Sequence, residues 1–167
     1  GTINVESEIG KGSTFTIEIN IKEIQKEKVE LEKTNNKQPL VLEGHILIVE
    51  DNKTNQLLIS KLLEKVSLTY KIANDGLEAI ELYEKENYDL ILMDENMPNM
   101  SGIEATKNIR EIENKLNSAK TPIIALTANA LKEDKLRFMS AGMDEHLTKP
   151  INIKLLYKTL QKYLVIK

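Results

Sequence analysis

Two patterns of hydrophobic and polar residues divide the chain near residue 45. Beyond it, short runs of consecutive apolar residues alternate with stretches whose apolar residues recur every three or four positions. Such runs are typical of strands buried on both faces, and the wider spacing is typical of amphipathic helices. The pattern predicts strands at 46–49, 68–73, 90–93, 121–127 and 144–148, and helices around 57–66, 77–86, 102–117, 130–141 and 151–164. This alternation indicates an α/β fold built on a doubly wound parallel sheet.

The N-terminal stretch alternates between polar and apolar residues, which predicts a β-hairpin. We expect Ile3 and Val5 on one face, and Phe15, Ile17 and Ile19 on another. An isolated two-stranded hairpin is at best marginally stable in water, so we expect this piece to belong to a larger sheet. The following segment, rich in Lys, Glu, Asn and Gln, is typical of a linker.

The composition narrows the class of protein. Hydrophobic residues make up 41% and charged residues 29% of the 167 residues, a balance typical of soluble globular domains. The formal charge of -3 argues against a nucleic-acid partner, and the lack of cysteine excludes a disulfide or a thiol nucleophile. No apolar run approaches the roughly 18 residues of a membrane span, and the first residues do not resemble a secretion signal. We therefore expect a cytoplasmic location without direct membrane contact.

Polar residues that suit phosphoryl chemistry stand at the carboxyl ends of four predicted strands. Glu50 and Asp51 follow the first strand, Asp94 the third, Thr127 the fourth and Lys149 the fifth. Because parallel strands end at the same edge of a sheet, we expect these side chains to converge there. Three crowded carboxylates are tolerable around a divalent cation, and oxygen ligands suit Mg²⁺ or Mn²⁺. A hydroxyl and an ammonium opposite that cation would bind a phosphoryl group, with Asp94 as the nucleophile that forms an acyl phosphate.

These strand ends resemble those of the receiver domain of two-component response regulators, over about residues 45–165. The resemblance rests on the motifs Val49-Glu-Asp-Asn52, Met93-Asp-Glu-Asn-Met-Pro-Asn-Met-Ser-Gly102, Ala125-Leu-Thr-Ala128 and Lys149-Pro150. It implies a flavodoxin-like (CheY-like) fold whose five parallel strands follow the order 2-1-3-4-5. It also implies that the chain takes a phosphoryl group from phosphohistidine in a phosphorelay.

The resemblance implies a role for each residue of the acid cluster. Asp94 would be the phosphoacceptor, and Glu50 and Asp51 would hold Mg²⁺ together with Asp94 and the backbone carbonyl of Asn96. A plain structural interpretation stands beside these roles, because acids that begin a helix are favoured by its dipole.

Three further residues complete the set that the resemblance implies. Thr127 would bind a phosphoryl oxygen, and Lys149 would pair with the phosphoryl group, aimed inward by a cis peptide bond before Pro150. Taken singly, Thr127 is also compatible with an ordinary strand residue and Lys149 with a solvated lysine. His146 is a departure, since the family usually carries Tyr or Phe there as a rotamer switch. It is either a switch residue with pH sensitivity or a strand histidine that points to solvent.

The first 21 residues resemble the last hairpin of a histidine-kinase ATP-binding domain, through the ending Gly10-Lys-Gly-Ser-Thr-Phe15. The chain is then similar to the C-terminal end of a hybrid sensor histidine kinase. Its parts would be the hairpin at 1–21, a linker at 22–44 and a receiver domain at 45–165. From this chain alone we expect neither ATP binding nor kinase activity, only its own phosphorylation and dephosphorylation.

The first predicted helix carries more apolar residues than one buried face requires. Either all six belong to the core, or an outer row that includes Leu58 or Leu62 is exposed beside the acids. The receiver family binds a phosphohistidine-bearing helix pair there, from a kinase dimerisation domain or a phosphotransfer domain. The fourth helix, fifth strand and fifth helix form its other partner face, and a homodimer stays open.

Three other functions remain as alternatives. An Asp-nucleophile phosphatase of the haloacid-dehalogenase type wants a second Asp where this chain has Asn96. A flavodoxin-like nucleotide binder would need a phosphate loop where Glu50 and Asp51 instead repel phosphate. A degenerate receiver that only binds partners would not need the complete set of five residues.

Overall fold

The N-terminal hairpin forms one of two compact units, which divide at residues 37 and 38. The computed structural model describes residues 1–19, 40–128 and 132–166, so most of the predicted linker and the start of the predicted fourth helix lie outside the described residues. Strands β1 (Thr2–Glu8) and β2 (Gly12–Glu18) pair antiparallel, with Ile3 opposite Ile17 and Val5 opposite Phe15. Directly opposed residues project from the same face. The prediction of two different faces was therefore wrong, because the register places these four apolar side chains on one.

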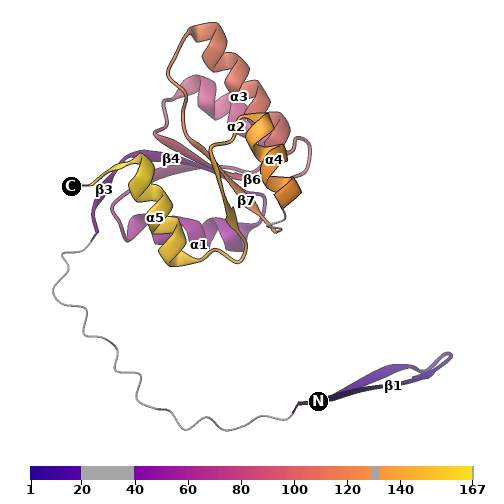
Figure 1. Cartoon of the computed structure of the whole chain (residues 1–167). Helices are drawn as coiled ribbons and strands as arrows, with labels where there is room; N and C mark the ends of the chain where they lie inside the picture. Colours follow the sequence, from indigo (N-terminus) through magenta and orange to yellow (C-terminus); the bar gives the residue numbers. More distant parts are fainter. Residues whose placement is uncertain (20–39, 129–131, 167) are drawn as a thin grey trace. The chain divides into compact units, whose positions relative to one another are not determined.

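The second unit is organised around a five-stranded parallel sheet (Figure 1). Its strands are β4 (His45–Val49), β5 (Thr69–Ala73), β6 (Leu90–Asp94), β7 (Ile123–Thr127) and β8 (Glu145–Thr148). Their spatial order is β5-β4-β6-β7-β8, and all four pairings are parallel. This confirms the predicted order 2-1-3-4-5 and brings the carboxyl ends of all five strands to one edge.

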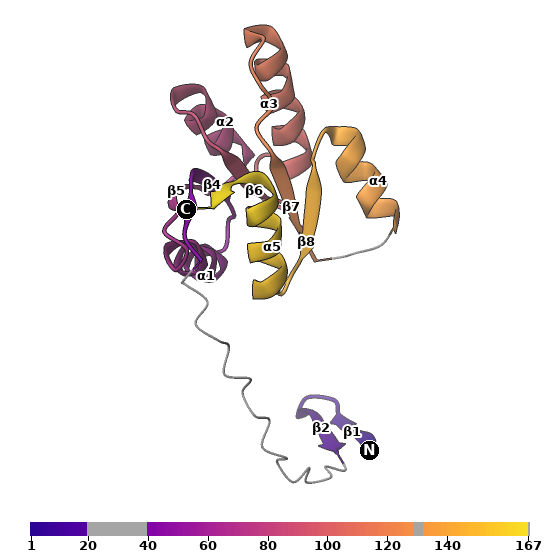
Figure 2. The ribbon, with the colours of Figure 1, turned by 60° about the vertical axis from the view of Figure 1, so that its left-hand side comes forward.

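Helices cover both faces of the sheet (Figures 1 and 2). One face carries α1 (Lys53–Glu64) and α5 (Ile153–Tyr163), and the other carries α2 (Gly76–Lys85), α3 (Gly102–Leu116) and α4 (Lys132–Ala141). Alternate residues of each strand serve the two layers: Ile46 and Ile48 pack with the α1 and α5 side, and Leu47 and Val49 with the other. The continuous apolar runs in the sequence follow from this burial on both faces.

A short second pairing joins the two ends of this unit. Strand β3 (Leu42–Glu43) pairs antiparallel with β9 (Val165–Ile166), and Leu42 is buried in the core beside α1 and α5. The packed unit therefore extends beyond residues 45 and 165, the limits expected from the receiver resemblance. No helix among the described residues is long and apolar enough to span a bilayer.

Helix α1 divides its apolar residues between core and surface. Ile59, Leu62 and Leu63 are buried, whereas Leu57 and Leu58 are 60% and 45% exposed. Of the two alternatives, the exposed outer row is therefore present, and it includes Leu58. Leu62 belongs to the core, because the 3.6-residue helical repeat places it on the sheet side with Ile59 and Leu63.

Candidate functional site

Three carboxylates meet at the carboxyl edge of the sheet. Glu50 and Asp51 directly follow β4, and Asp94 is the last residue of β6. One carboxylate oxygen from each lies within 4.8 Å of the others. Glu50 and Asp94 are buried and Asp51 is exposed, so the cluster has a closed base and an open side. Among the residues that the structure describes, it is the only group of three or more potential metal ligands.

Two local features fix the loops that carry these acids. Asn52 caps α1 by accepting hydrogen bonds from the backbone N–H groups of Thr54 and Asn55, so the helix starts at Lys53, two residues after Asp51. At Gly102, the first residue of α3, an added Cβ would lie 2.1 Å from the backbone oxygen of Asp94. Only glycine permits this close approach of α3 to the end of β6.

Lys149, which directly follows β8 at the edge of the sheet, completes the cluster. Its Nζ lies 2.7 Å from Glu50 Oε2 and 2.7 Å from Asp94 Oδ2. Its backbone N–H donates to the carbonyl of Thr127, and the following peptide bond to Pro150 is cis, as the resemblance implies. The other oxygen of Glu50 accepts a hydrogen bond from the Asn55 side chain at 2.7 Å. The predicted convergence of the acids and Lys149 is therefore present.

The acid cluster carries more negative charge than the ammonium of Lys149 can neutralise. Burial raises the pKa of the Asp94 carboxyl, the Lys149 ammonium acts against that, and the negative charge of Glu50 adds to it. Burial acts to lower the pKa of Lys149, but its hydrogen bonds and attraction to Asp94 and Glu50 outweigh this and raise it. One ammonium, paired with Glu50 and Asp94, is thus set against the three negative charges of the cluster, a balance that favours a bound cation.

The three carboxylates suit Mg²⁺ as ligands, both in the type of atom they offer and in their spacing. All the ligand atoms are oxygens, which hard divalent cations prefer, and they lie close enough together to share one ion. Asn96, the remaining expected ligand, is adjacent, and its backbone N–H lies 3.5 Å from Asp94 Oδ1.

The two expected switch residues lie on the α4 side of the site. Thr127 ends β7 and is fully buried, and its hydroxyl donates to Glu95 Oε2 at 2.8 Å. His146 on β8 is partly buried, with its ring 6.4 Å from the Phe138 ring of α4, so it does not simply point to solvent.

Sequence reasoning missed Glu95. This acid follows Asp94, is buried, and binds both Thr127 and Arg137 of α4. The signal that found Glu50 and Asp51, an acid directly after an apolar strand, applies to Glu95 as well.

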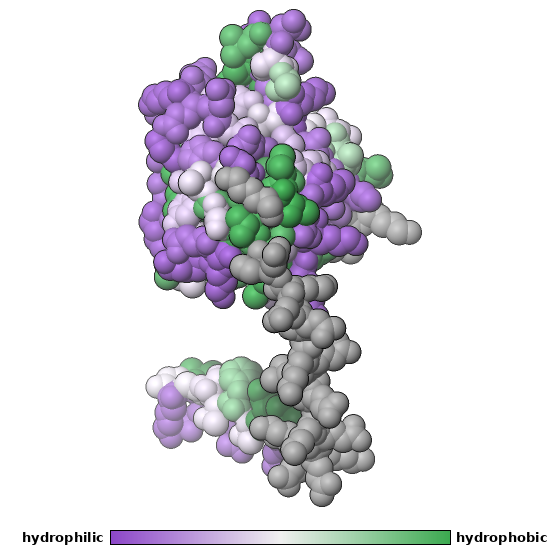
Figure 3. Space-filling view, turned by 90° about the vertical axis from the view of Figure 1, so that its left-hand side faces the viewer, coloured by the Kyte–Doolittle hydropathy of each residue, from purple (hydrophilic) through white to green (hydrophobic). Residues whose placement is uncertain are grey.

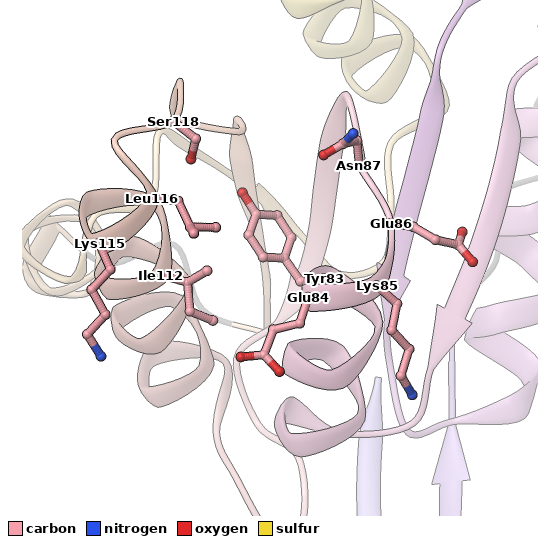
Figure 4. Close-up of a pocket in the computed structure, with 9 residues that line it drawn as sticks. All are labelled: Tyr83, Glu84, Lys85, Glu86, Asn87, Ile112, Lys115, Leu116 and Ser118. Carbon is pink, nitrogen blue, oxygen red and sulfur yellow. The ribbon is translucent and has the colours of Figure 1, made fainter.

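A separate hollow of about 490 Å³ lies between α2 and α3 (Figure 4). Tyr83, Asn87, Ile112 and Ser118 are among the residues that line it. Asn87 and Ser118 precede β6 and β7, so the hollow lies at the amino edge of the sheet, opposite the acid cluster. It is not part of the candidate site.

Comparison with known proteins identifies this arrangement. The family model described as response regulator receiver domain matches residues 46–161. The chain belongs to this family. Among relatives, it is 49% identical over 120 residues to hybrid signal transduction histidine kinase I of Dictyostelium discoideum, which covers 69% of this chain and 7% of that protein. It is 40% identical over 164 residues to the autoinducer 2 sensor kinase/phosphatase LuxQ of Vibrio vulnificus, covering 96% of this chain and 18% of the relative.

Solved receiver domains have the same fold. The receiver domain of the sensor histidine kinase PA1611 from Pseudomonas aeruginosa, which has a magnesium ion in its active-site cleft, matches with a TM-score of 0.65 and 40% identity, over 72% of this chain and 96% of that one. A chain from the complex of the Saccharomyces cerevisiae phosphotransfer protein Ypd1 with the receiver domain of Ssk1 matches with a TM-score of 0.71 and 35% identity. The match covers 74% of this chain and 90% of that one. The chain thus contains a receiver domain. It spans only 7% to 20% of the curated relatives cited here and of sensor protein ArcB from Escherichia coli.

Proposed function

We propose that this receiver domain accepts a phosphoryl group on Asp94 and passes it on or releases it by hydrolysis. The observation that carries the proposal is the position of Lys149 Nζ, 2.7 Å from carboxylate oxygens of both Asp94 and Glu50, beside a third acid, Asp51. A structural ion pair needs one acid for one lysine, whereas a phosphoryl site needs a nucleophile, a cation site and a counter-charge at one place.

The transfer requires little covalent chemistry from the protein. A carboxylate oxygen of Asp94 forms a bond to phosphorus as the bond from phosphorus to the donor nitrogen of phosphohistidine breaks, and the electron pair of that bond stays on the imidazole. Lys149 would pair with the transferred group, which would lower the cost of bringing that charge next to Glu50. Mg²⁺ bound by Glu50, Asp51, Asp94 and the carbonyl of Asn96 would supply further positive charge opposite the phosphoryl oxygens.

Incubation with acetyl phosphate and Mg²⁺, followed by intact mass measurement, tests the proposal. We expect a gain of one phosphoryl group that is absent from Asp94→Asn and retained by Asp89→Asn, the same substitution at the amino edge. Uptake that persists in Asp94→Asn, or no uptake by the wild type, would contradict the assignment.

We infer that the phosphohistidine donor docks on the exposed apolar residues of α1. Leu57 and Leu58 lie within the first two turns after Asp51, and Ile153 at the start of α5 is also exposed. The solved complex of Ypd1 with a receiver domain supports a partner of this kind. Leu57→Glu and Leu58→Glu should slow phosphoryl transfer from a phosphorylated phosphotransfer protein and leave uptake from acetyl phosphate unchanged. Equal slowing with both donors would count against docking there.

We also propose that the hairpin belongs to a kinase ATP-binding domain. Its apolar face, formed by Ile3, Val5, Phe15 and Ile17, is exposed and contributes to the green surface of this unit in Figure 3. The alignments to LuxQ and ArcB cover 96% and 98% of the chain, well beyond the receiver domain. Amide hydrogen exchange over residues 2–18 should be fast in this chain and slow in a longer protein that includes the upstream kinase segment. Fast exchange in both would refute this origin.

A further inference from the structure

Glu95 links two elements that a phosphoryl group on Asp94 would disturb. Its Oε2 accepts the hydroxyl of Thr127, the last residue of β7, at 2.8 Å. Its Oε1 forms an ion pair with Arg137 of α4. The side chain is only 10% exposed, so both partners compensate for the burial of this carboxylate.

The contact with Thr127 competes with the role proposed for that hydroxyl. A hydroxyl has one proton to donate, so it cannot donate to Glu95 and to a phosphoryl oxygen at the same time. When Thr127 turns toward the phosphoryl group, Glu95 loses one of its two partners while Arg137 remains. A carboxylate with fewer donors is less stable where it is buried and more stable in water.

We propose that Glu95 is a positioning residue that holds Thr127 in the unphosphorylated arrangement and transmits its release to α4 through Arg137. This inference rests on the function proposed for Asp94 and Thr127. The Arg137 side chain is 52% exposed, so water can solvate it when the pair loosens. The two arrangements of Thr127 then form a two-state element, and any ligand that takes the hydroxyl shifts its population.

Affinity for beryllofluoride with Mg²⁺, a phosphoryl mimic that requires no chemical step, measures this competition. Without Glu95, the hydroxyl no longer has to break its hydrogen bond to this carboxylate before it meets the ligand. We therefore expect Glu95→Ala to bind beryllofluoride about three- to tenfold more tightly than the wild type, as judged by calorimetric titration. Glu111→Ala, at an exposed position on α3, is the matched control and should bind like the wild type.

A double-mutant cycle separates positioning from a merely structural effect. In a Thr127→Ala background, Glu95→Ala should no longer change the affinity, because the hydroxyl through which it acts is gone. An effect of the same size in that background would overturn the proposal. Glu95→Gln keeps an oxygen for Thr127, but the neutral amide is a weaker acceptor than the carboxylate, so we expect a smaller gain in affinity. If Glu95→Ala does not fold, unchanged affinity in Glu95→Gln would overturn the proposal instead.

Failure of the inference and failure of the proposed function give different results. If the wild type takes up neither phosphoryl group nor beryllofluoride, the function assigned to Asp94 is wrong. If the wild type binds beryllofluoride and Asp94→Asn does not, but Glu95→Ala binds it no more tightly than the wild type, only the role of Glu95 is refuted.

Discussion

Charged side chains cluster at both edges of the sheet, but only one cluster is fully paired. At the amino edge, Arg110 donates to the carbonyls of Gly142 and Thr121, to both oxygens of Glu113 and to Asp144, all at 2.8 to 2.9 Å. Glu113 is 1% exposed and accepts in addition from the Thr121 backbone N–H at 2.7 Å. The donors are arranged in the planar fork that suits carboxylates, and the one guanidinium pairs with both acids, the buried Glu113 and the more exposed Asp144.

At the carboxyl edge the same kinds of group are left unmatched. Among the described residues, Lys149 pairs with Glu50 and Asp94 but not with Asp51, the third acid of the cluster. In a cluster that contributes to stability, the charged groups pair with one another within the protein. In a cluster that binds a ligand, at least one charge lacks such a partner and is available to the ligand. The difference between the two edges is therefore the difference between a structural network and a site.

The largest effect that follows from this comparison concerns stability. Arg110→Ala should lower the free energy of unfolding by about 3 kcal/mol or more, because it leaves the buried Glu113 without its cation. Urea unfolding measures the loss. At a temperature where the variant is folded, phosphoryl uptake on Asp94 should be retained, since the network lies at the opposite edge. Loss of uptake in a folded variant would show that the two clusters are coupled.

A smaller effect concerns the cation. In the wild type, Mg²⁺ at ten times its dissociation constant should raise the free energy of unfolding by about 1.4 kcal/mol. Asp51→Asn should lose most of this response, because it removes an exposed member of the acid cluster. Asp144→Asn makes the same change in the paired network and should respond to Mg²⁺ like the wild type. An equal response in all three proteins would place the cation elsewhere.

The sequence predicts the site better than the network, for a physical reason. Glu50, Asp51, Asp94 and Lys149 stand at strand ends, and parallel topology alone brings strand ends together. Glu113 lies on the same helix as Arg110, but the other partners of Arg110 depend on how α3 packs against the loops before β7 and β8, which periodicity does not encode. The faces of the hairpin were mispredicted for the same reason, since they depend on a register that links two strands.

The smallest expected effect is a change of stability with pH at two carboxyls, Asp94 and Asp75, whose pKa values move in opposite directions. Burial, opposed by Lys149, raises the pKa of Asp94, so without a divalent cation the folded state binds this proton more tightly than the unfolded chain does. The contribution of Asp94 to stability is then lowest above its folded pKa, rises as the pH falls through that value, and levels off below the unfolded value of about 3.9. Asp94→Asn should accordingly be more stable than the wild type at pH 7, with a gap that narrows toward pH 4.

Asp75 provides the matched control, because its pKa moves in the opposite direction. The backbone N–H of Glu78 and the side chain of Asn99 donate to this helix-capping carboxylate and lower its pKa. Its stabilising contribution is present above the unfolded pKa and is lost as the pH falls through the folded one. Asp75→Asn should therefore be less stable than the wild type at neutral pH, again with a gap that closes on acidification. If Asp94→Asn behaves in the same way as Asp75→Asn, the attraction of Lys149 outweighs burial, and the carboxyl edge is a paired network like that of Arg110.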